Sequence, residues 1–182
     1  MLKTIQYYRN KERDISLSLF LLRHRLQKEE FRKVLSPNRD GRSRLVQIIA
    51  YCLMPTHIHF ILKQLEDGGI STFMRLVLNS YARYFNIKHK RKGPLWQNRF
   101  KNILVESDEQ LYHLSRYVHK NPIKANLVHR PEQWRFSSYL EYIHSDKIAE
   151  KVCDYQDVLD IQRDEYIEFV NNDATDDQEG HL

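Results

Sequence analysis

The segment over residues 45–63 constrains the fold more than any other part of the chain. Two runs of strand-favouring residues, 45–54 and 57–63, are separated by a Pro-Thr pair, which predicts a two-stranded hairpin. In the second run His57 and His59 alternate with apolar residues. Because alternate residues of a strand point to the same face, both imidazoles should leave one face while the apolar face is buried. The apolar residues are Ile58, Phe60 and Leu62.

Two imidazoles on one face of a strand are a candidate metal site. Imidazole suits zinc, manganese, iron and nickel. Two such ligands are too few for a closed structural zinc site, so the predicted site is open, as catalysis requires. The same pair is also compatible with surface or hydrogen-bonded histidines that hold no metal.

A second feature lies about sixty residues downstream, where residues 107–122 read as a helix. The segment opens on a Ser-x-x-Gln capping box, and Pro122 is its predicted stop. Tyr117 and Asn121 are four residues apart and share a face if the helix reaches its last turn. A phenol would then stand one turn from an amide oxygen that could be a third metal ligand.

Other tyrosines compete for a chemical role, since the chain has eleven and most tyrosines are packing residues. Tyr112 lies on the same predicted helix, but five residues earlier, which turns it about 140° away from Tyr117. Tyr81 and Tyr84 follow the apolar stripe of the preceding helix and read as core or groove. Tyr117 therefore ranks first.

Four motifs together carry a family resemblance. They are His57-Ile58-His59; Gly-Pro-Leu-Trp-Gln-Asn-Arg-Phe-Lys at residues 93–101; Tyr-Val-His-Lys-Asn-Pro-Ile-Lys-Ala-Asn-Leu-Val at residues 117–128; and Pro-Glu-Gln-Trp-Arg-Phe-Ser-Ser-Tyr at residues 131–139. In order and spacing they resemble the single-tyrosine transposases of the His-hydrophobe-His superfamily, most closely the branch associated with repetitive extragenic palindromes (REP). The resemblance is strong over residues 45–140.

The resemblance implies a metal-dependent single-stranded DNA endonuclease and strand transferase that forms a 5′-phosphotyrosyl intermediate during DNA transposition. It makes Tyr117 the nucleophile and His57, His59 and Asn121 the residues that hold a divalent ion, Mg²⁺ or Mn²⁺. A phenol with a pKa of ~10 needs such a metal or a base. Two alternatives stay open: a relative that binds hairpin-flanked single-stranded DNA without cleaving it, and an unrelated phosphoesterase that activates water.

The fold implied by the resemblance is α+β, an antiparallel sheet sandwich of ferredoxin-like type with helices on one face. Relatives open with an interior strand, whereas residues 1–9 resemble the family's first helix, so the first strand is expected to be missing. The patterns also predict helices over residues 17–35 and 71–88 and a strand over 99–105.

Charge divides the chain into a basic body and an acidic tail. Residues 1–144 hold 26 Lys and Arg against 12 Asp and Glu, while residues 145–182 hold 3 against 12. We therefore expect a transposase-like domain over 1–144 and an acidic extension over 145–182 with a helix at 164–170. A basic body attracts phosphates, and an indole can stack on unpaired bases. The predicted DNA-binding residues are Trp96, Arg99, Lys101, Arg116, Lys120 and Lys124.

The remaining composition bears on location and partners. Two cysteines form neither a disulfide framework nor a Cys-x-x-Cys clip, which indicates a reducing cytoplasm. No apolar run reaches 18 residues, so no membrane partner is expected. With the resemblance, the prediction is a nucleoid-associated protein of a bacterial or archaeal cell that binds single-stranded or hairpin DNA as a monomer or homodimer.

Overall fold

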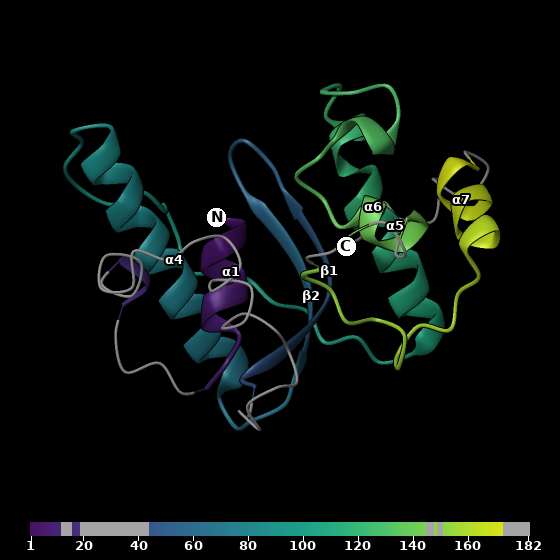
Figure 1. The fold of residues 1–182 in the computed structure, drawn as a ribbon, viewed down its shortest axis with the longest axis horizontal. Helices are drawn as coiled ribbons and strands as arrows, with labels where there is room; N and C mark the ends of the chain where they lie inside the picture. Colours follow the sequence, from purple (N-terminus) through teal and green to yellow (C-terminus); the bar gives the residue numbers. More distant parts are fainter. Residues whose placement is uncertain (12–15, 19–43, 145–147, 149–150, 173–182) are drawn as a thin grey trace. The chain divides into compact units, whose positions relative to one another are not determined.

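A computed structural model describes residues 1–11, 16–18, 44–144, 148 and 151–172, and these residues form an α+β structure (Figure 1). The chain divides into two compact units. The first holds Met1–Gln47 and Lys63–Asn102, and the second holds Ile48–Leu62 and Ile103–Leu182. The helix predicted over residues 17–35 lies almost entirely outside the described residues.

The predicted hairpin is confirmed. Its strands, β1 (Val46–Leu53) and β2 (Ile58–Gln64), pair as a two-stranded sheet, and the amide of Met54 donates to the carbonyl of His57 (2.9 Å) to close the turn. Among the described residues the sheet has no further strand, only isolated bridges. The boundary between the two units crosses the hairpin, so each unit contains part of both strands.

The predicted division of β2 into a buried apolar face and an open histidine face is wrong. Ile58 and Phe60 are only half-buried, whereas Ile61, which shares the face of His59, is buried. Alternation determines which way side chains point, but the elements packed on each face determine which of them lose solvent.

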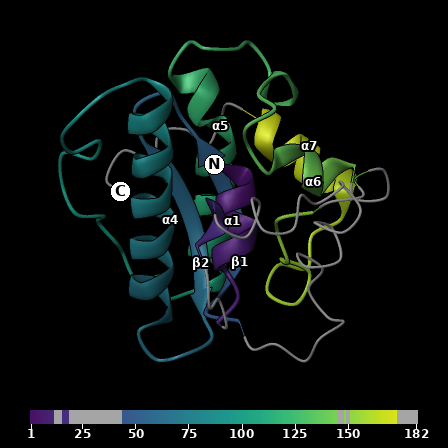
Figure 2. The same ribbon diagram turned by 60° about the vertical axis from the view of Figure 1, so that its left-hand side comes forward.

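In the first unit, α1 (Leu2–Tyr8) lies beside α4 (Gly69–Lys88), as the two views agree (Figures 1 and 2). Residues 1–11 contain α1 and an isolated antiparallel bridge between Asn10 and Arg44. α4 starts at Gly69, two residues before the predicted start, and two glycines stand at this end. Gly68 has φ of 65°, and a Cβ on Gly69 would lie 2.2 Å from the carbonyl oxygen of Leu45, so only glycine fits this close approach.

The strand predicted over residues 99–105 is wrong. Residues 99–107 have no regular secondary structure, and Ile103 and Leu104 are 63% and 75% exposed. Residues that favour strands form one only where a neighbour supplies the hydrogen bonds and covers the apolar side chains. No described segment pairs with this one.

The second unit contains the predicted tyrosine helix, α5 (Asp108–Lys124). Its start is confirmed: the side chain of Ser107 accepts from the amide of Gln110 (3.1 Å). Its predicted stop is wrong, because Pro122 lies inside the helix. A proline within a helix removes one backbone N–H donor, yet the helix continues for two more residues, to Lys124.

The end of α5 is decided by Asn126. This residue adopts φ of 53°, and its amide donates to the carbonyl of Ile123 (2.8 Å), while the amide of Leu127 donates to that of Pro122 (2.9 Å). These two bonds form a Schellman motif, in which Asn is one of the few residues that tolerates a left-handed conformation.

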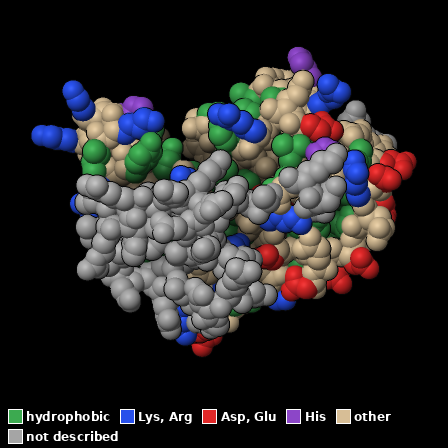
Figure 3. All heavy atoms as spheres, in the orientation of Figure 1, with side chains coloured by type: hydrophobic (Ala, Val, Ile, Leu, Met, Phe, Trp, Pro, Cys, Tyr) green, Lys and Arg blue, Asp and Glu red, His purple; other side chains and the backbone are tan. Residues whose placement is uncertain are grey.

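The described part of the acidic extension packs within the second unit. The helix predicted at 164–170 is confirmed as α7 (Arg163–Asn171), which contacts α5 and α6 (Tyr139–Ile143). The buried carboxylate of Glu141 accepts from the amides of Val152 and Cys153, each at 2.8 Å. Acidic side chains gather on the surface over this segment (Figure 3). The predicted boundary at residue 144 thus falls inside a compact unit.

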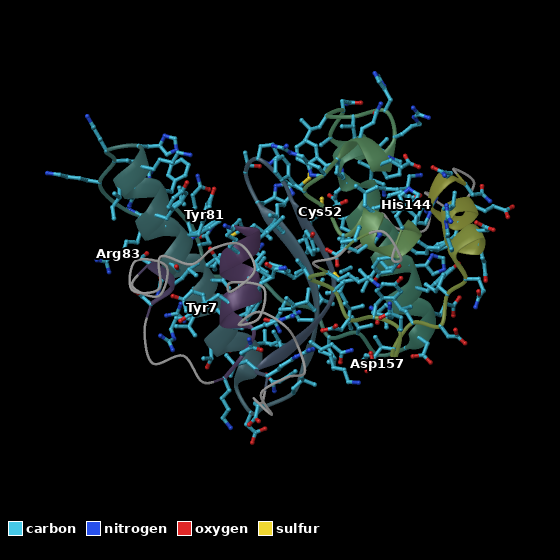
Figure 4. The ribbon with its side chains drawn as sticks, viewed as in Figure 1. Tyr7, Cys52, Tyr81, Arg83, His144 and Asp157 are labelled. Atoms are coloured by element: carbon cyan, nitrogen blue, oxygen red, sulfur yellow. The ribbon has the colours of Figure 1, made fainter. Side chains whose placement is uncertain are left out.

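No helix in the described ranges is long and apolar enough to cross a bilayer. Both cysteines are buried free thiols. Cys52 lies on β1 (Figure 4) and forms an isolated bridge with Ser137.

Candidate active site

His57, His59 and Tyr117 come together although about sixty residues separate them in sequence. The ring of His59 stands edge-on to both neighbours, with its centroid 4.7 Å from that of His57 and 5.6 Å from that of Tyr117. The interplanar angles are 86° and 89°. The turn and the start of β2 supply His57 and His59, and α5 supplies the phenol, all within the second unit.

His59 has an unsatisfied nitrogen. Its Nε2 is buried and has no hydrogen-bond partner among the described residues. Burial, with a smaller contribution from the neighbouring His57, lowers the pKa of His59 to about 4 against an opposing interaction with the side chain of Asn121. The ring is therefore neutral near pH 7, and its Nε2 can accept a ligand. Leaving such an atom unpaired costs about 1–3 kcal/mol, which a ligand would recover.

His57 is exposed, and one of its nitrogens is already engaged. Nδ1 lies 3.0 Å from the hydroxyl of Thr56, which leaves Nε2 for a ligand. A histidine that binds a metal commonly has its second nitrogen held in this way. The pair thus offers two imidazole nitrogens at the same place.

Asn121 supplies the third polar group. Its Nδ2 donates to the carbonyl of Tyr117 one turn earlier (2.8 Å), which leaves Oδ1 as the side chain's acceptor beside His59. The described residues contain no group of three or more His, Cys, Asp or Glu able to hold a metal. Two imidazole nitrogens and an amide oxygen nevertheless fit a divalent ion whose remaining positions are filled by water or phosphate oxygens.

A cation stands next to the phenol. The ammonium group of Lys124 lies 5.1 Å from the ring centroid of Tyr117, within the range of a cation–π contact. Lys124 is exposed and Tyr117 is half-buried. The predicted DNA-binding residue Lys124 therefore lies where it can contact a phosphate that reaches the tyrosine.

A buried chain of hydrogen bonds holds α5 in place. His119 is completely buried, with Nδ1 2.6 Å from the hydroxyl of Tyr166 and Nε2 2.7 Å from that of Ser138. Ser138 in turn bonds the backbone of Tyr51 on β1, and Tyr166 donates to Ser115 on α5 (3.1 Å). Burial lowers the pKa of His119 to about 3. The sequence does not indicate this role, since nothing local separates His119 from a surface histidine.

Two of the predicted DNA-binding residues require correction. Arg116 is fully buried, and its guanidinium donates to the carbonyls of Phe169 (2.8 Å) and Asn172 at the end of α7. Lys120 is only 4% exposed. α7 covers the face of α5 that carries Arg116. The sequence predicts a solvent-exposed arginine at this position, but the side chain is buried and binds the C-terminal end of α7.

Tyr112 also faces α7. Its ring stacks on Phe169 with a centroid distance of 3.8 Å, and burial, with a contribution from Glu165, raises the pKa of the phenol. The predicted rotation away from Tyr117 is confirmed, and Tyr112 serves as a packing residue.

The other three predicted residues belong to the first unit. Trp96 is half-buried, and its ring centroid lies 6.1 Å from that of Tyr81, which is labelled in Figure 4. Its indole donates to the carbonyl of Leu78 on α4 (3.0 Å). Arg99 and Lys101 are exposed. Further basic side chains, which form no motif in the sequence, project where α4 ends (Figure 3). They are Lys88, Lys90, Arg91 and Lys92.

Comparison with known proteins gives two matches. The family model described as "Transposase IS200 like" matches residues 22–121, a range that contains the histidine pair, Tyr117 and Asn121. A curated protein of Haemophilus influenzae, named as a REP-associated tyrosine transposase, is 30% identical over 115 residues. That match covers 57% of this chain and 62% of the relative, so the chain spans less than two thirds of the relative's length. No solved structure matches.

Proposed function

This chain belongs to the IS200-like transposase family, and on that premise we propose that it is a metal-dependent single-stranded DNA endonuclease and strand transferase. One observation carries the proposal: the ring of Tyr117 lies 5.6 Å from that of His59, whose buried Nε2 has no partner among the described residues. A phenol beside two imidazoles that could hold a metal ion is an arrangement suited to attack on a phosphodiester.

In the proposed reaction the phenolic oxygen of Tyr117 attacks the scissile phosphorus. The phenol gives up its proton to solvent as the new bond joins tyrosine to the 5′-phosphate. The bond to the 3′-oxygen breaks, and that oxygen takes up a proton from solvent and leaves as a free 3′-hydroxyl. A divalent ion held by His57, His59 and Asn121 would polarise the phosphate. Lys124 contributes a positive charge next to the phenol, which favours both the bound phosphate and the phenolate.

The substrate within this proposal is single-stranded DNA beside a hairpin. A phenol on a helix must meet a backbone phosphate in line, which an unpaired and flexible strand permits more easily than a uniform duplex. Exposed cations of both units supply sequence-independent attraction to phosphates, among them Arg99, Lys101 and Lys124.

We also expect the hairpin of β1 and β2 to belong to an antiparallel sandwich of ferredoxin-like type.

Covalent trapping tests the proposal. A labelled oligonucleotide with a hairpin and single-stranded flanks is incubated with the protein and Mn²⁺ or Mg²⁺, and the products are separated under denaturing conditions. Wild type should form a labelled protein–DNA adduct, and Tyr117→Phe, which removes only the nucleophilic oxygen, should form none. Tyr112→Phe is the matched control on the same helix and should behave as wild type.

Two results would contradict the proposal. An adduct formed by Tyr117→Phe would exclude this tyrosine as the nucleophile. Wild type that binds hairpin-flanked single strands but never forms an adduct would favour the alternative, a relative that binds such DNA without cleavage.

A further inference from the structure

An exposed aromatic side chain lies on the segment between η1 (Pro131–Gln133) and α6. Phe136 is 38% exposed, and the guanidinium carbon of Arg135 lies 4.7 Å from its ring centroid. The indole of Trp134 stands edge-on to the same ring, at 5.5 Å and 75°. We call these three residues the aromatic ledge. Phe136 thus leaves part of its surface to solvent while a cation lies against it.

The ledge is held rigidly at the end of β1. The amide of Leu53 donates to the carbonyl of Phe136 (2.9 Å), and the indole N–H of Trp134 donates to the carbonyl of Leu53 (3.2 Å). The amide of Ser138 donates to the carbonyl of Tyr51 (2.9 Å), which completes the bridge between Ser137 and Cys52, labelled in Figure 4. An aromatic surface anchored by three hydrogen bonds to β1 loses little conformational entropy when a ligand covers it.

The same strand end carries the candidate active site. Leu53 pairs with Phe136, whereas the next residue, Met54, pairs with His57, and successive amides of a strand point to opposite edges. The aromatic ledge and the turn that carries His57 therefore lie on opposite sides of β1. Two strand spacings of about 4.8 Å place roughly 10 Å between their backbones, which a few nucleotides of single strand can span.

We propose that the aromatic ledge is a base-stacking site, on which Phe136 and Arg135 hold one unpaired nucleobase of the strand that is cleaved. The inference rests on the proposed function, since it places this base next to the scissile phosphate. Every nucleobase has a flat face that stacks on an aromatic ring, and an arginine at the ring contributes both a second flat surface and a charge for the adjoining phosphate. The site therefore takes single-stranded nucleic acid with little preference for the base.

The test uses hairpin-flanked oligonucleotides that carry the fluorescent base 2-aminopurine at successive single-stranded positions. Wild type should quench the fluorescence strongly at one position near the cleavage point. Phe136→Leu should abolish that quenching and weaken binding by about tenfold, and Arg135→Gln should weaken binding less. Leu127→Ala, which alters another exposed apolar residue of the second unit, is the matched control and should leave both unchanged.

Circular dichroism of each variant checks that it is folded, and the outcomes separate the two proposals. If folded Phe136→Leu shows the same quenching and affinity as wild type, and wild type still forms the covalent adduct, the proposed base-stacking role is overturned and the proposed function is not. Wild type that neither binds the oligonucleotides nor forms an adduct would overturn the proposed function and the ledge with it. If both proposals hold, Phe136→Leu should need about ten times more DNA for half-maximal adduct.

Discussion

Replacing His119 tests whether the buried chain of hydrogen bonds stabilises the second unit. The pKa of His119 is about 3 in the folded protein, against ~6.5 in an unfolded chain. The unfolded state therefore binds a proton more readily, so the stability that comes from this group is present above pH 6.5 and is lost as the pH falls toward 3. Between pH 7 and pH 5 the loss amounts to about 2 kcal/mol of unfolding free energy.

The assay is urea unfolding at pH 7 and pH 5, followed by tryptophan fluorescence. A Trp96→Phe background leaves Trp134 as the reporter, which belongs to the same unit as His119. His119→Gln keeps a polar group near Ser138 but abandons Tyr166, so at pH 7 it should be less stable by about 1–3 kcal/mol. Because glutamine does not titrate, this deficit should shrink by about 2 kcal/mol at pH 5.

Other groups also respond to pH, so the quantity that matters is the difference between wild type and variant. His129, an exposed histidine of the same unit, provides the control: His129→Gln should follow the wild-type pH dependence. If the free energies of unfolding of wild type and His119→Gln fall by the same amount between pH 7 and pH 5, the pKa of His119 does not differ between the folded and unfolded states. That result would refute the reasoning.

Three further predictions concern the histidine pair, the buried Arg116 and the exposed Lys124. His57→Ala combined with His59→Ala should abolish the Mn²⁺-dependent adduct yet change DNA affinity by less than roughly tenfold, ~1.4 kcal/mol, as measured by fluorescence anisotropy; a larger loss would show that the pair binds DNA directly. Arg116→Ala should lower the free energy of unfolding by about 2–4 kcal/mol in urea titrations, because it leaves two carbonyls of α7 without their donor; an unchanged midpoint would contradict this role of Arg116. Lys124→Ala should change that free energy by less than about 0.5 kcal/mol but reduce the slope of log affinity against log salt by about 1, whereas an unchanged slope would exclude a phosphate contact.

Local pattern predicted the parts of this protein whose causes are local. Alternation over residues 45–63 predicts the hairpin, and Ser107 with Gln110 predicts where α5 starts, because strand registers and helix caps depend on neighbours a few residues away. The spacing of Tyr117 and Asn121 likewise predicts one shared face. The motifs then indicated the family, to which the chain does belong.

Tertiary packing decided the rest. Arg116 and Tyr117 are neighbours on one helix, yet one is buried under α7 and the other borders His59, because a helix turns each residue about 100° and only the packed elements determine which direction is covered. Pro122 does not stop α5, since one missing N–H is tolerated where Asn126 can close the helix. The role of His119 depends on partners at positions 138 and 166, and no pattern within its own helix encodes contacts made across that distance.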